Sequence, residues 1–306
     1  MRRLPPQLLL VLACLFWAGN MIIARVMRTE IPPIAMAFWR WAFACAILLP
    51  FVARELMLQR AVIRRHWRIL VALAFLGVAA YNTFSYLGLQ TTTATNAALF
   101  NSAMPVFIAL LSWSVLRERL GLLQTLGVIV SLAGVIVILS RGDLHALAQL
   151  RFTPGDLWFL AATILWAAYT IVLRWRPAQL SSLAFLGTLV LIGVPILLPA
   201  YVWELSTGRG FEINVATVAS LAYYGTFPSL AAYQCWNSGV AALGAQRAGL
   251  YVHLMPVFVA LLSFLILGES LHVYHVPGIA LIAAGLYLTG ALKRKRGVSR
   301  CNDDAA

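Results

Sequence analysis

The chain has 306 residues, of which 62% are hydrophobic and 11% are charged, with a formal net charge of +13. A soluble domain averages about 45–50% apolar and about 25% charged residues, and a globule of about 300 residues still leaves about a quarter of its unfolded surface in water. This composition excludes a soluble enzyme, a disordered chain and a disulfide scaffold. It indicates an integral membrane protein.

Ten stretches are long and apolar enough to cross a bilayer, because a spanning helix needs about 20 mostly apolar residues. In chain order they cover residues 7–27, 33–53, 69–89, 93–115, 121–140, 156–172, 180–203, 213–238, 243–267 and 273–292. The first follows Arg2 and Arg3 like a signal peptide, but no clean cleavage site of small residues follows it, so we expect it to stay in the chain. The sequence predicts an all-α integral membrane protein with ten transmembrane helices.

The basic residues predict how these helices are oriented. With the N-terminus in the cytoplasm, 17 of the 23 Lys and Arg residues fall on the cytoplasmic side and five on the far side. Cytoplasmic loops carry an excess of Lys and Arg. We therefore expect a multi-pass protein of the bacterial inner (plasma) membrane with both termini cytoplasmic and a basic tail over residues 293–306. No basic run alternates with aromatic residues on a soluble module, so no nucleic-acid partner is expected.

The two halves of the chain repeat each other. Phe16-Trp17-Ala18 corresponds to Leu165-Trp166-Ala167 at an offset of 149, and Met104-Pro105-Val106-Phe107 to Met255-Pro256-Val257-Phe258 at an offset of 151. Each copy holds five predicted helices, an odd number, so the second copy enters the membrane from the opposite side. Residues 7–140 and 156–292 are thus predicted to form two inverted five-helix repeats. This architecture is typical of secondary transporters, with the substrate site near the midplane between the repeats.

Polar and aromatic residues recur at helical spacing within these stretches, and exposing such groups to lipid would be costly. Tryptophan and tyrosine combine a large apolar face with a polar tip, which suits a small amphipathic or aromatic solute. Interhelical hydrogen bonding is the alternative role for each residue. The candidate substrate-binding residues are Trp17, Asn20, Tyr81, Ser85, Asn101, Trp166, Tyr169, Tyr233, Trp236, Asn237 and His253.

Two prolines, Pro105 and Pro256, fall at equivalent places inside predicted helices. Each lacks an N–H and clashes with the carbonyl four residues back, so the carbonyls of Asn101 and Val252 are expected to lose their helical partner. Matching interruptions in the two halves indicate a transporter site, which gives these prolines a structural or gating role. A plain kink satisfied by a neighbouring helix is the alternative.

Apart from tyrosine and cysteine, Arg40 and His253 are the ionisable residues well inside the predicted helices. We expect Arg40 to have a structural or gating role, tying helices together through backbone carbonyls; attraction of a carboxylate is the alternative. We expect His253 to be neutral and hydrogen-bonded, with proton transfer as the alternative. Gly127, Gly134, Gly278 and Gly285 are expected to serve close packing, within the chain or in a homodimer.

Three stretches carry a family resemblance. They are Leu15-Phe16-Trp17-Ala18-Gly19-Asn20; Met104-Pro105-Val106-Phe107 with Arg117-Glu118-Arg119-Leu120; and Met255-Pro256-Val257-Phe258 with Leu267-Gly268-Glu269-Ser270-Leu271. In these the chain resembles the drug/metabolite transporter superfamily, specifically its ten-span EamA type. The resemblance implies an inverted-repeat carrier of amino acids, other small metabolites or toxic compounds, often moved outward. It also implies that the fifth and tenth helices pack peripherally.

We therefore expect a secondary active transporter, an exporter or exchanger of small metabolites such as neutral or aromatic amino acids, working by alternating access. Export of drugs or other hydrophobic compounds is the alternative, and a membrane enzyme or other non-transporting protein is less favoured. The sequence contains no GxxxxGK[ST] motif, so it does not indicate an ATP-driven pump. The expected partners are a small-molecule substrate and membrane lipid, and neither a cofactor nor a metal is expected.

Overall fold

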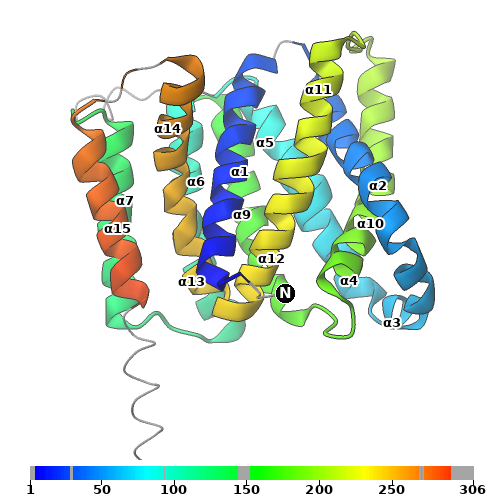
Figure 1. The fold of residues 1–306 in the computed structure, drawn as a ribbon, viewed down its shortest axis with the longest axis horizontal. Coiled ribbons are helices and arrows are strands. Elements are labelled where there is room, and N and C mark those ends of the chain that lie inside the picture. The colour runs from blue at the N-terminus through cyan, green and yellow to red at the C-terminus, as the bar shows by residue number, and fades with distance from the viewer. Residues whose placement is uncertain are drawn as a thin grey trace, which may run out of the picture.

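The computed structural model describes residues 4–27, 30–92, 94–143, 152–268, 270 and 272–290. Within this part the chain is helical and contains no strand. The first half holds α1 (Pro6–Met27), α2 (Pro33–Leu58), α3 (Arg60–Arg65), α4 (Trp67–Leu73), η1 (Ala74–Ala80), α5 (Tyr81–Leu89), α6 (Ala94–Leu116) and α7 (Leu122–Leu139). The second half holds α9 (Pro154–Val172), η2 (Leu173–Trp175), α10 (Ser182–Ser206), α11 (Val215–Tyr224), η3 (Gly225–Ala231), α12 (Ala232–Leu243), α13 (Ala245–Leu250), η4 (Tyr251–Leu254), α14 (Met255–Leu267) and α15 (His275–Gly290). The long helices stand side by side as one bundle (Figure 1).

Eight helical stretches of the described chain are long and apolar enough to cross a membrane. This confirms a multi-pass, all-α membrane protein, and the eight coincide with the first seven predicted spans and the ninth. The predicted eighth span is the helical run α11–η3–α12, whose tyrosines and amide residues make it more polar than the others. The predicted tenth span is α15, of which 16 residues are described. The count of ten membrane-spanning helices stays a prediction.

Two π-helical turns interrupt the bundle at matching places, and hydropathy had given no sign of them. The turn η1 begins at Ala74 and η3 begins at Gly225, an offset of 151 residues. A π-turn widens the helix and often marks a functional site. The carbonyl of Gly77 in η1 accepts hydrogen bonds from Tyr233 Oη and from Asn82 Nδ2, the latter at 3.1 Å. The widened turn thus offers a backbone carbonyl to the other half of the chain.

Two buried carboxylates hold helix starts in place. Glu204, near the end of α10, accepts hydrogen bonds from the backbone N–H of Ile34 at 3.2 Å and Ala35 at 2.6 Å, in the first turn of α2. Asp156 accepts from the Thr153 N–H at 2.6 Å at the start of α9, and also from the Thr92 hydroxyl. Free N–H groups and the helix dipole favour negative charge at a helix start. Both carboxylates are therefore stabilised there, and among the described residues neither forms an ion pair with a basic side chain.

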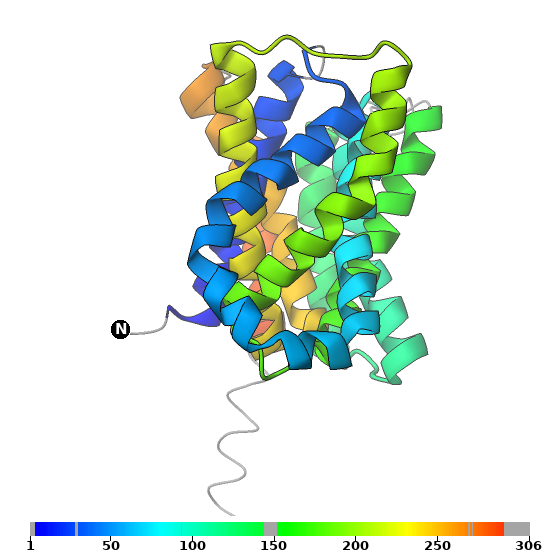
Figure 2. The same ribbon diagram turned by 90° about the vertical axis from the view of Figure 1, so that its right-hand side faces the viewer.

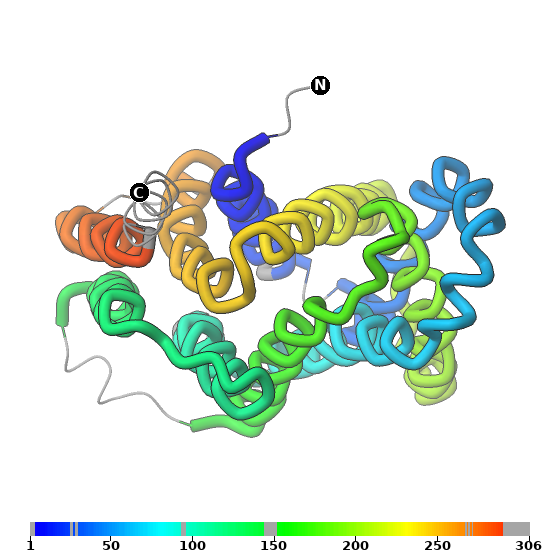
Figure 3. The backbone as a smooth tube through the Cα atoms, turned by 90° about the horizontal axis from the view of Figure 1, so that it is seen from below, coloured from blue at the N-terminus to red at the C-terminus, as the bar shows by residue number. Residues whose placement is uncertain are grey.

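The main packing partners come from opposite halves of the chain. Helix α1 packs against α12 and α14, α9 packs against α5 and α6, and α2 packs against α10; α2 and α10 cross at one side of the bundle (Figure 2). Helices α7 and α15 lie together at the opposite edge (Figures 1 and 3). This peripheral position is what the family resemblance implied for the fifth and tenth helices.

Glycines allow the close approach of α7 and α15. A Cβ added to Gly134 would lie 2.6 Å from the carbonyl oxygen of Gly278, and one added to Gly285 would lie 2.6 Å from the carbonyl oxygen of Gly127. Both contacts are with backbone, which cannot swing aside as a side chain can. The four glycines therefore serve packing within the chain. A homodimer stays a prediction.

Candidate functional site

An aromatic cluster occupies the interface between the two halves. Its members are Trp17, Trp41, Tyr81, Trp166, Tyr169, Tyr233 and Trp236. The Trp166 ring is central, with ring-centroid distances of 4.6 Å to Tyr81, 5.1 Å to Trp17 and 5.2 Å to Tyr233. The contacts of Trp166 with Trp17 and Tyr233 are edge-to-face. Each such pair contributes about 0.5–1.5 kcal/mol of stabilisation beyond that from the buried area. The pairs that link the two halves therefore stabilise the interface between them.

Hydrogen bonds fix the polar edges of this cluster. The Tyr169 hydroxyl donates to Asn237 Oδ1 at 2.8 Å, and Trp17 Nε1 donates to the Pro228 carbonyl in η3 at 3.0 Å. Asn82 Nδ2 lies 3.1 Å from the Tyr233 hydroxyl, which in turn donates to the Gly77 carbonyl. The rings are therefore oriented by partners on both sides of the interface.

The middle of the cluster is buried, and three donors in or beside it have no hydrogen-bond partner in the described chain. Trp166, Tyr169, Tyr233 and Trp236 are each at most 1% exposed. Within the described part of the chain, Trp41 Nε1, Trp236 Nε1 and Asn237 Nδ2 are buried without a hydrogen-bond partner. An unmet buried donor costs about 1–3 kcal/mol. A ligand with acceptor groups beside these donors would recover that loss.

Arg40 is buried beside the cluster, 2% exposed, on α2. Its Nε donates to Ser229 Oγ at 2.7 Å, and its Nη1 donates to the Tyr86 hydroxyl at 2.7 Å and to Asn20 Oδ1 at 3.5 Å. These partners are side-chain oxygens and not the backbone carbonyls that we expected. The reason is that α1, α5 and η3 each direct a polar side chain toward this point, namely Asn20, Tyr86 and Ser229. Arg40 therefore ties three elements from the two halves together.

His253 lies apart from the aromatic cluster. Its Nε2 is 2.9 Å from the Ser102 carbonyl of α6, and its Nδ1 is 2.7 Å from Ser131 Oγ of α7. A carbonyl can only accept, so Nε2 carries a proton and donates it to the Ser102 carbonyl. Among the described residues its ring contacts none of the cluster rings. These contacts join η4 to α6 and α7, which is a packing role.

The remaining candidates are spread along α5, α6 and α14. Ser85 lies one turn after Tyr81 on α5, half-buried. Asn101 is 5% exposed on α6, and neither atom of its amide has a hydrogen-bond partner within the described residues. Pro105 lies inside the continuous helix α6, whereas Pro256 stands in the first turn of α14 after the 3-10 turn η4. The Val252 carbonyl accepts from the Met255 N–H in that turn, so it is not left free as we had expected.

The sequence analysis missed several members of the site. Trp41 packs edge-to-face on Tyr233 at 4.9 Å, and Tyr86 and Ser229 bind Arg40. Trp41 follows Arg40 in a largely apolar helix, where a lone aromatic residue is ordinarily a core residue. Tyr86 lies one turn after Asn82 and shares the spacing expected to face the bundle interior, but its bond to Arg40 was not expected. Ser229 carries one signal that could have been used, because it follows Pro228 in an otherwise apolar stretch.

The fold defines a multi-pass, all-helical membrane protein. The family profile described as "EamA-like transporter family" matches residues 4–140 and again residues 153–291. The chain therefore belongs to the EamA-like transporter family, and it is a transporter of small molecules, not an enzyme.

Similar proteins agree with this assignment. An uncharacterized transporter of Archaeoglobus fulgidus is 32% identical over 93% of this chain and 97% of its own length. The uncharacterized transporter YyaM of Bacillus subtilis is 23% identical over 96% of each chain. A probable terminal-alkyne amino-acid exporter of Streptantibioticus cattleyicolor is 29% identical over 71% of this chain and 69% of its own. One crystal structure superposes with a TM-score of 0.76 at 21% identity, over 95% of this chain and 98% of that one, and supports the fold.

Proposed function

We propose that the protein is a secondary active transporter that moves neutral or aromatic amino acids, as exporter or exchanger, by alternating access between two inverted repeats. The observation that carries this proposal is that residues at equivalent positions of the two halves touch each other. Trp17 meets Trp166 at an offset of 149, with ring centroids 5.1 Å apart. Asn82 meets Tyr233 and Ser102 meets His253, both at an offset of 151.

Self-contact of equivalent positions is what a two-fold axis between the repeats requires, because a residue on such an axis meets its own counterpart. The glycines of α7 and α15 are also related by the repeat, but each contacts the counterpart of the other glycine and not its own. Gly127 faces Gly285, and Gly134 faces Gly278. At the offset of 151, Gly127 corresponds to Gly278 and Gly134 to Gly285, so the repeat exchanges the two contacts. These pairs support five-helix repeats over residues 7–140 and 156–292.

In this proposal the aromatic cluster forms the substrate site near the midplane of the membrane. In carriers built from inverted repeats the substrate lies between the halves, and one half rocks against the other. Trp17, Trp166, Tyr233 and Trp236 contribute ring faces, while Asn20 and Asn237 contribute amides, so the site suits a solute with an aromatic or amphipathic body. The Streptantibioticus relative that is named as a probable amino-acid exporter supports this substrate class and outward transport.

The proposed topology has ten membrane helices in the bacterial inner membrane, with both termini in the cytoplasm. The start of α1 and the described end of α15 lie at the same face of the bundle, and the arginine-bearing helix α3 lies there too (Figure 1). Basic residues mark the cytoplasmic side. A reporter fused after Ala306 is expected to be cytoplasmic, and a periplasmic signal would contradict this orientation.

Export of drugs or other hydrophobic compounds is the second candidate function. The observation in its favour is the cluster itself, since aromatic faces accept many apolar solutes without a specific hydrogen-bond pattern. A cationic drug is disfavoured at this site because the charged group beside the cluster is Arg40.

Transport by purified protein in liposomes tests the proposal. Vesicles loaded with unlabelled phenylalanine are expected to accumulate labelled phenylalanine by exchange, whereas protein-free vesicles are not. A panel of neutral and aromatic amino acids, other metabolites and hydrophobic drugs then separates the two candidate functions. Flux of drugs without flux of amino acids would favour the second, and no flux for any member of the panel would contradict a carrier role.

A further inference from the structure

We propose that Arg40 binds the carboxylate group of the transported solute, so that the carrier selects carboxylate-bearing aromatic solutes over neutral or cationic analogues with the same ring. The inference rests on the proposed function, because it assigns one substrate group to the same central site. It goes further by naming the residue that sets the substrate's charge class.

Arg40 is a buried charge without a counter-ion. It is 2% exposed, and its three hydrogen bonds all go to neutral groups. Among the residues that the structure describes, no Asp or Glu pairs with it, and the two buried carboxylates, Asp156 and Glu204, are held at helix starts elsewhere. A charged side chain at membrane depth is costly and is ordinarily paired. A carboxylate on the ligand would complete this pair.

The guanidinium has donors left for such a ligand. It carries five N–H groups, and the three bonds use Nε and Nη1, which leaves the two N–H groups of Nη2 with no partner in the described chain. The bond from Nη1 to Asn20 Oδ1 is long, at 3.5 Å, and is the easiest to exchange. Nη2 together with that arm of Nη1 forms the planar fork that binds a carboxylate through both oxygens.

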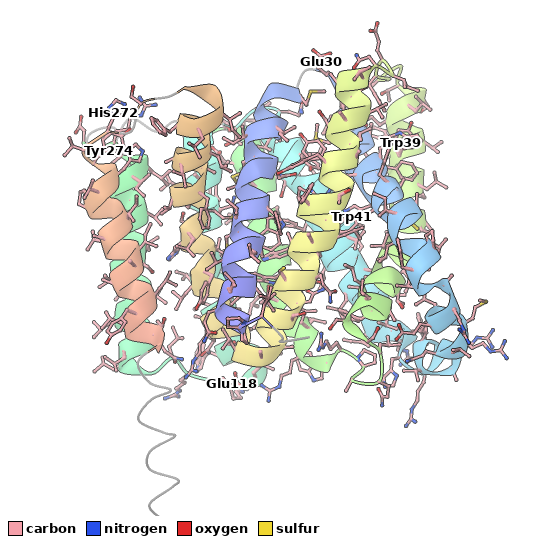
Figure 4. The ribbon with its side chains drawn as sticks, in the orientation of Figure 1. Glu30, Trp39, Trp41, Glu118, His272 and Tyr274 are labelled. Carbon is pink, nitrogen blue, oxygen red and sulfur yellow. The ribbon has the colours of Figure 1, made fainter. Side chains whose placement is uncertain are left out.

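The position of Arg40 joins the charge to the aromatic cluster. The guanidinium carbon lies 5.5 Å from the centroid of the Trp41 ring, and Trp41 packs on Tyr233 at 4.9 Å. Trp41 lies between the two ends of the bundle, far from Glu30 at one end and Glu118 at the other (Figure 4). A solute whose carboxylate sits on Arg40 would therefore lay its apolar body toward Tyr233 and Trp166, near mid-depth.

Arg40 also lies where binding can act on the interface between the halves. Its partners Asn20 and Tyr86 belong to the first half, and Ser229 belongs to the second. The bond from Arg40 to Ser229 joins the halves, so a carboxylate that takes the place of Asn20 would bind directly beside this cross-half bond. A purely structural tie would need no ligand and would show no preference among solutes, so substrate preference separates the two roles.

The test compares two probes that differ at one group, in proteoliposomes made with the full chain. Phenylalanine carries the carboxylate, and phenylalaninamide carries a neutral amide in its place. We expect wild-type protein to prefer phenylalanine by about tenfold or more in competition for labelled phenylalanine, since charge-assisted hydrogen bonds are among the strongest polar contacts. Equal competition by the two probes would overturn the inference and leave the proposed carrier in place. No uptake of labelled phenylalanine would contradict the proposed substrate class, and this inference with it.

The variant Arg40→Gln is expected to lose the preference for phenylalanine, and Arg54→Gln is the matched control. Arg54 is an exposed arginine on the same helix, so its replacement should keep the preference. Arg40→Lys keeps the charge but lacks the fork, and we expect a reduced preference. An unchanged preference in Arg40→Gln would overturn the inference. If neither Arg40 variant folds, the wild-type preference between the two probes decides.

Discussion

The halves of this transporter meet in two regions that are built differently. At the centre, the halves meet through the rings of the aromatic cluster and the side-chain hydrogen bonds of Arg40. Several buried donors there have no hydrogen-bond partner in the described chain. At the edge, α7 and α15 meet through glycines, with backbone against backbone. Side-chain contacts can be exchanged for ligand contacts, whereas a glycine-mediated backbone contact has nothing to exchange.

Under the proposed alternating access, this difference predicts that the central region is the one that moves. Rings and hydrogen-bonded side chains can change rotamer and partner, so the central region can open and close again around a solute. The α7–α15 pair cannot separate slightly without losing its close contacts, because packed interfaces change between discrete arrangements and do not stretch. We expect changes at the edge to alter stability, and changes at the centre to alter transport first.

The largest expected effect is at the edge. Gly134→Val should strongly destabilise the protein, because its Cβ would lie 2.6 Å from the Gly278 carbonyl oxygen and 2.8 Å from Leu281 Cβ. Overpacking typically costs about 1–3 kcal/mol, and more where backbone must shift. A clear fall in Tm in detergent micelles checks this. Gly121→Ala, just before the same helix, is the control, since a Cβ added there would lie 3.8 Å from its nearest neighbour, Gln124 Oε1. Equal Tm values for the two variants would contradict tight packing between α7 and α15.

The next effect is at the centre. Trp166→Ala removes the ring that contacts Trp17, Tyr81 and Tyr233, and we expect phenylalanine exchange to fall at least about tenfold, as loss of a central aromatic anchor does at other binding sites. Exchange rate per folded protein is the measurement. Trp158→Ala, on the same helix with a ring 44% exposed, should keep most of the activity. Unchanged exchange in Trp166→Ala would move the site elsewhere.

A His253 variant tests whether this residue behaves like the edge, affecting stability, or like the centre, affecting transport. His253→Ala removes the hydrogen bonds to the Ser102 carbonyl and Ser131 Oγ, with an expected loss of about 1–3 kcal/mol because the carbonyl stays buried. We expect a lower Tm with an unchanged order of substrate preference. The exposed His272→Ala serves as the control. A changed preference would place His253 with the central site.

The smallest effect should come from one hydroxyl at the centre. Tyr169→Phe keeps the ring but removes the 2.8 Å bond to Asn237 Oδ1, which is worth about 1 kcal/mol. We expect a modest rise in the apparent KM for phenylalanine with little change in Tm. Tyr287→Phe, at a site 75% exposed, should change neither. An unaltered KM in Tyr169→Phe would mean that this hydroxyl does not orient the site.

Much of the fold could be predicted because the bilayer leaves few choices. Apolar stretches of suitable length must be helices in lipid, and α1, α2, α6 and α10 begin and end within a few residues of the predicted spans. The π-turns η1 and η3 could not be predicted, since an extra residue in one turn leaves the apolar pattern intact. The polar run α11–α12 was recognised as a helix although its composition is weakly membrane-like.

The candidate site could be predicted only in part. Helical spacing selected Trp17, Trp166, Tyr233 and Trp236, and the structure brings these rings together. The same spacing selected His253 and Asn101, which lie outside the cluster. Spacing within one helix reports which residues share a face, but not which helix that face meets, so Trp41 and Ser229 were overlooked.

By itself, the sequence determined that this protein is helical and lies in a membrane, and that its two halves repeat each other. These properties follow from composition and periodicity, which act residue by residue along the chain. The tertiary structure alone decided that Trp17 meets Trp166, that Arg40 bonds to Tyr86 and Ser229, and that Gly134 faces Gly278. Those contacts depend on how distant helices pack, which no local pattern specifies.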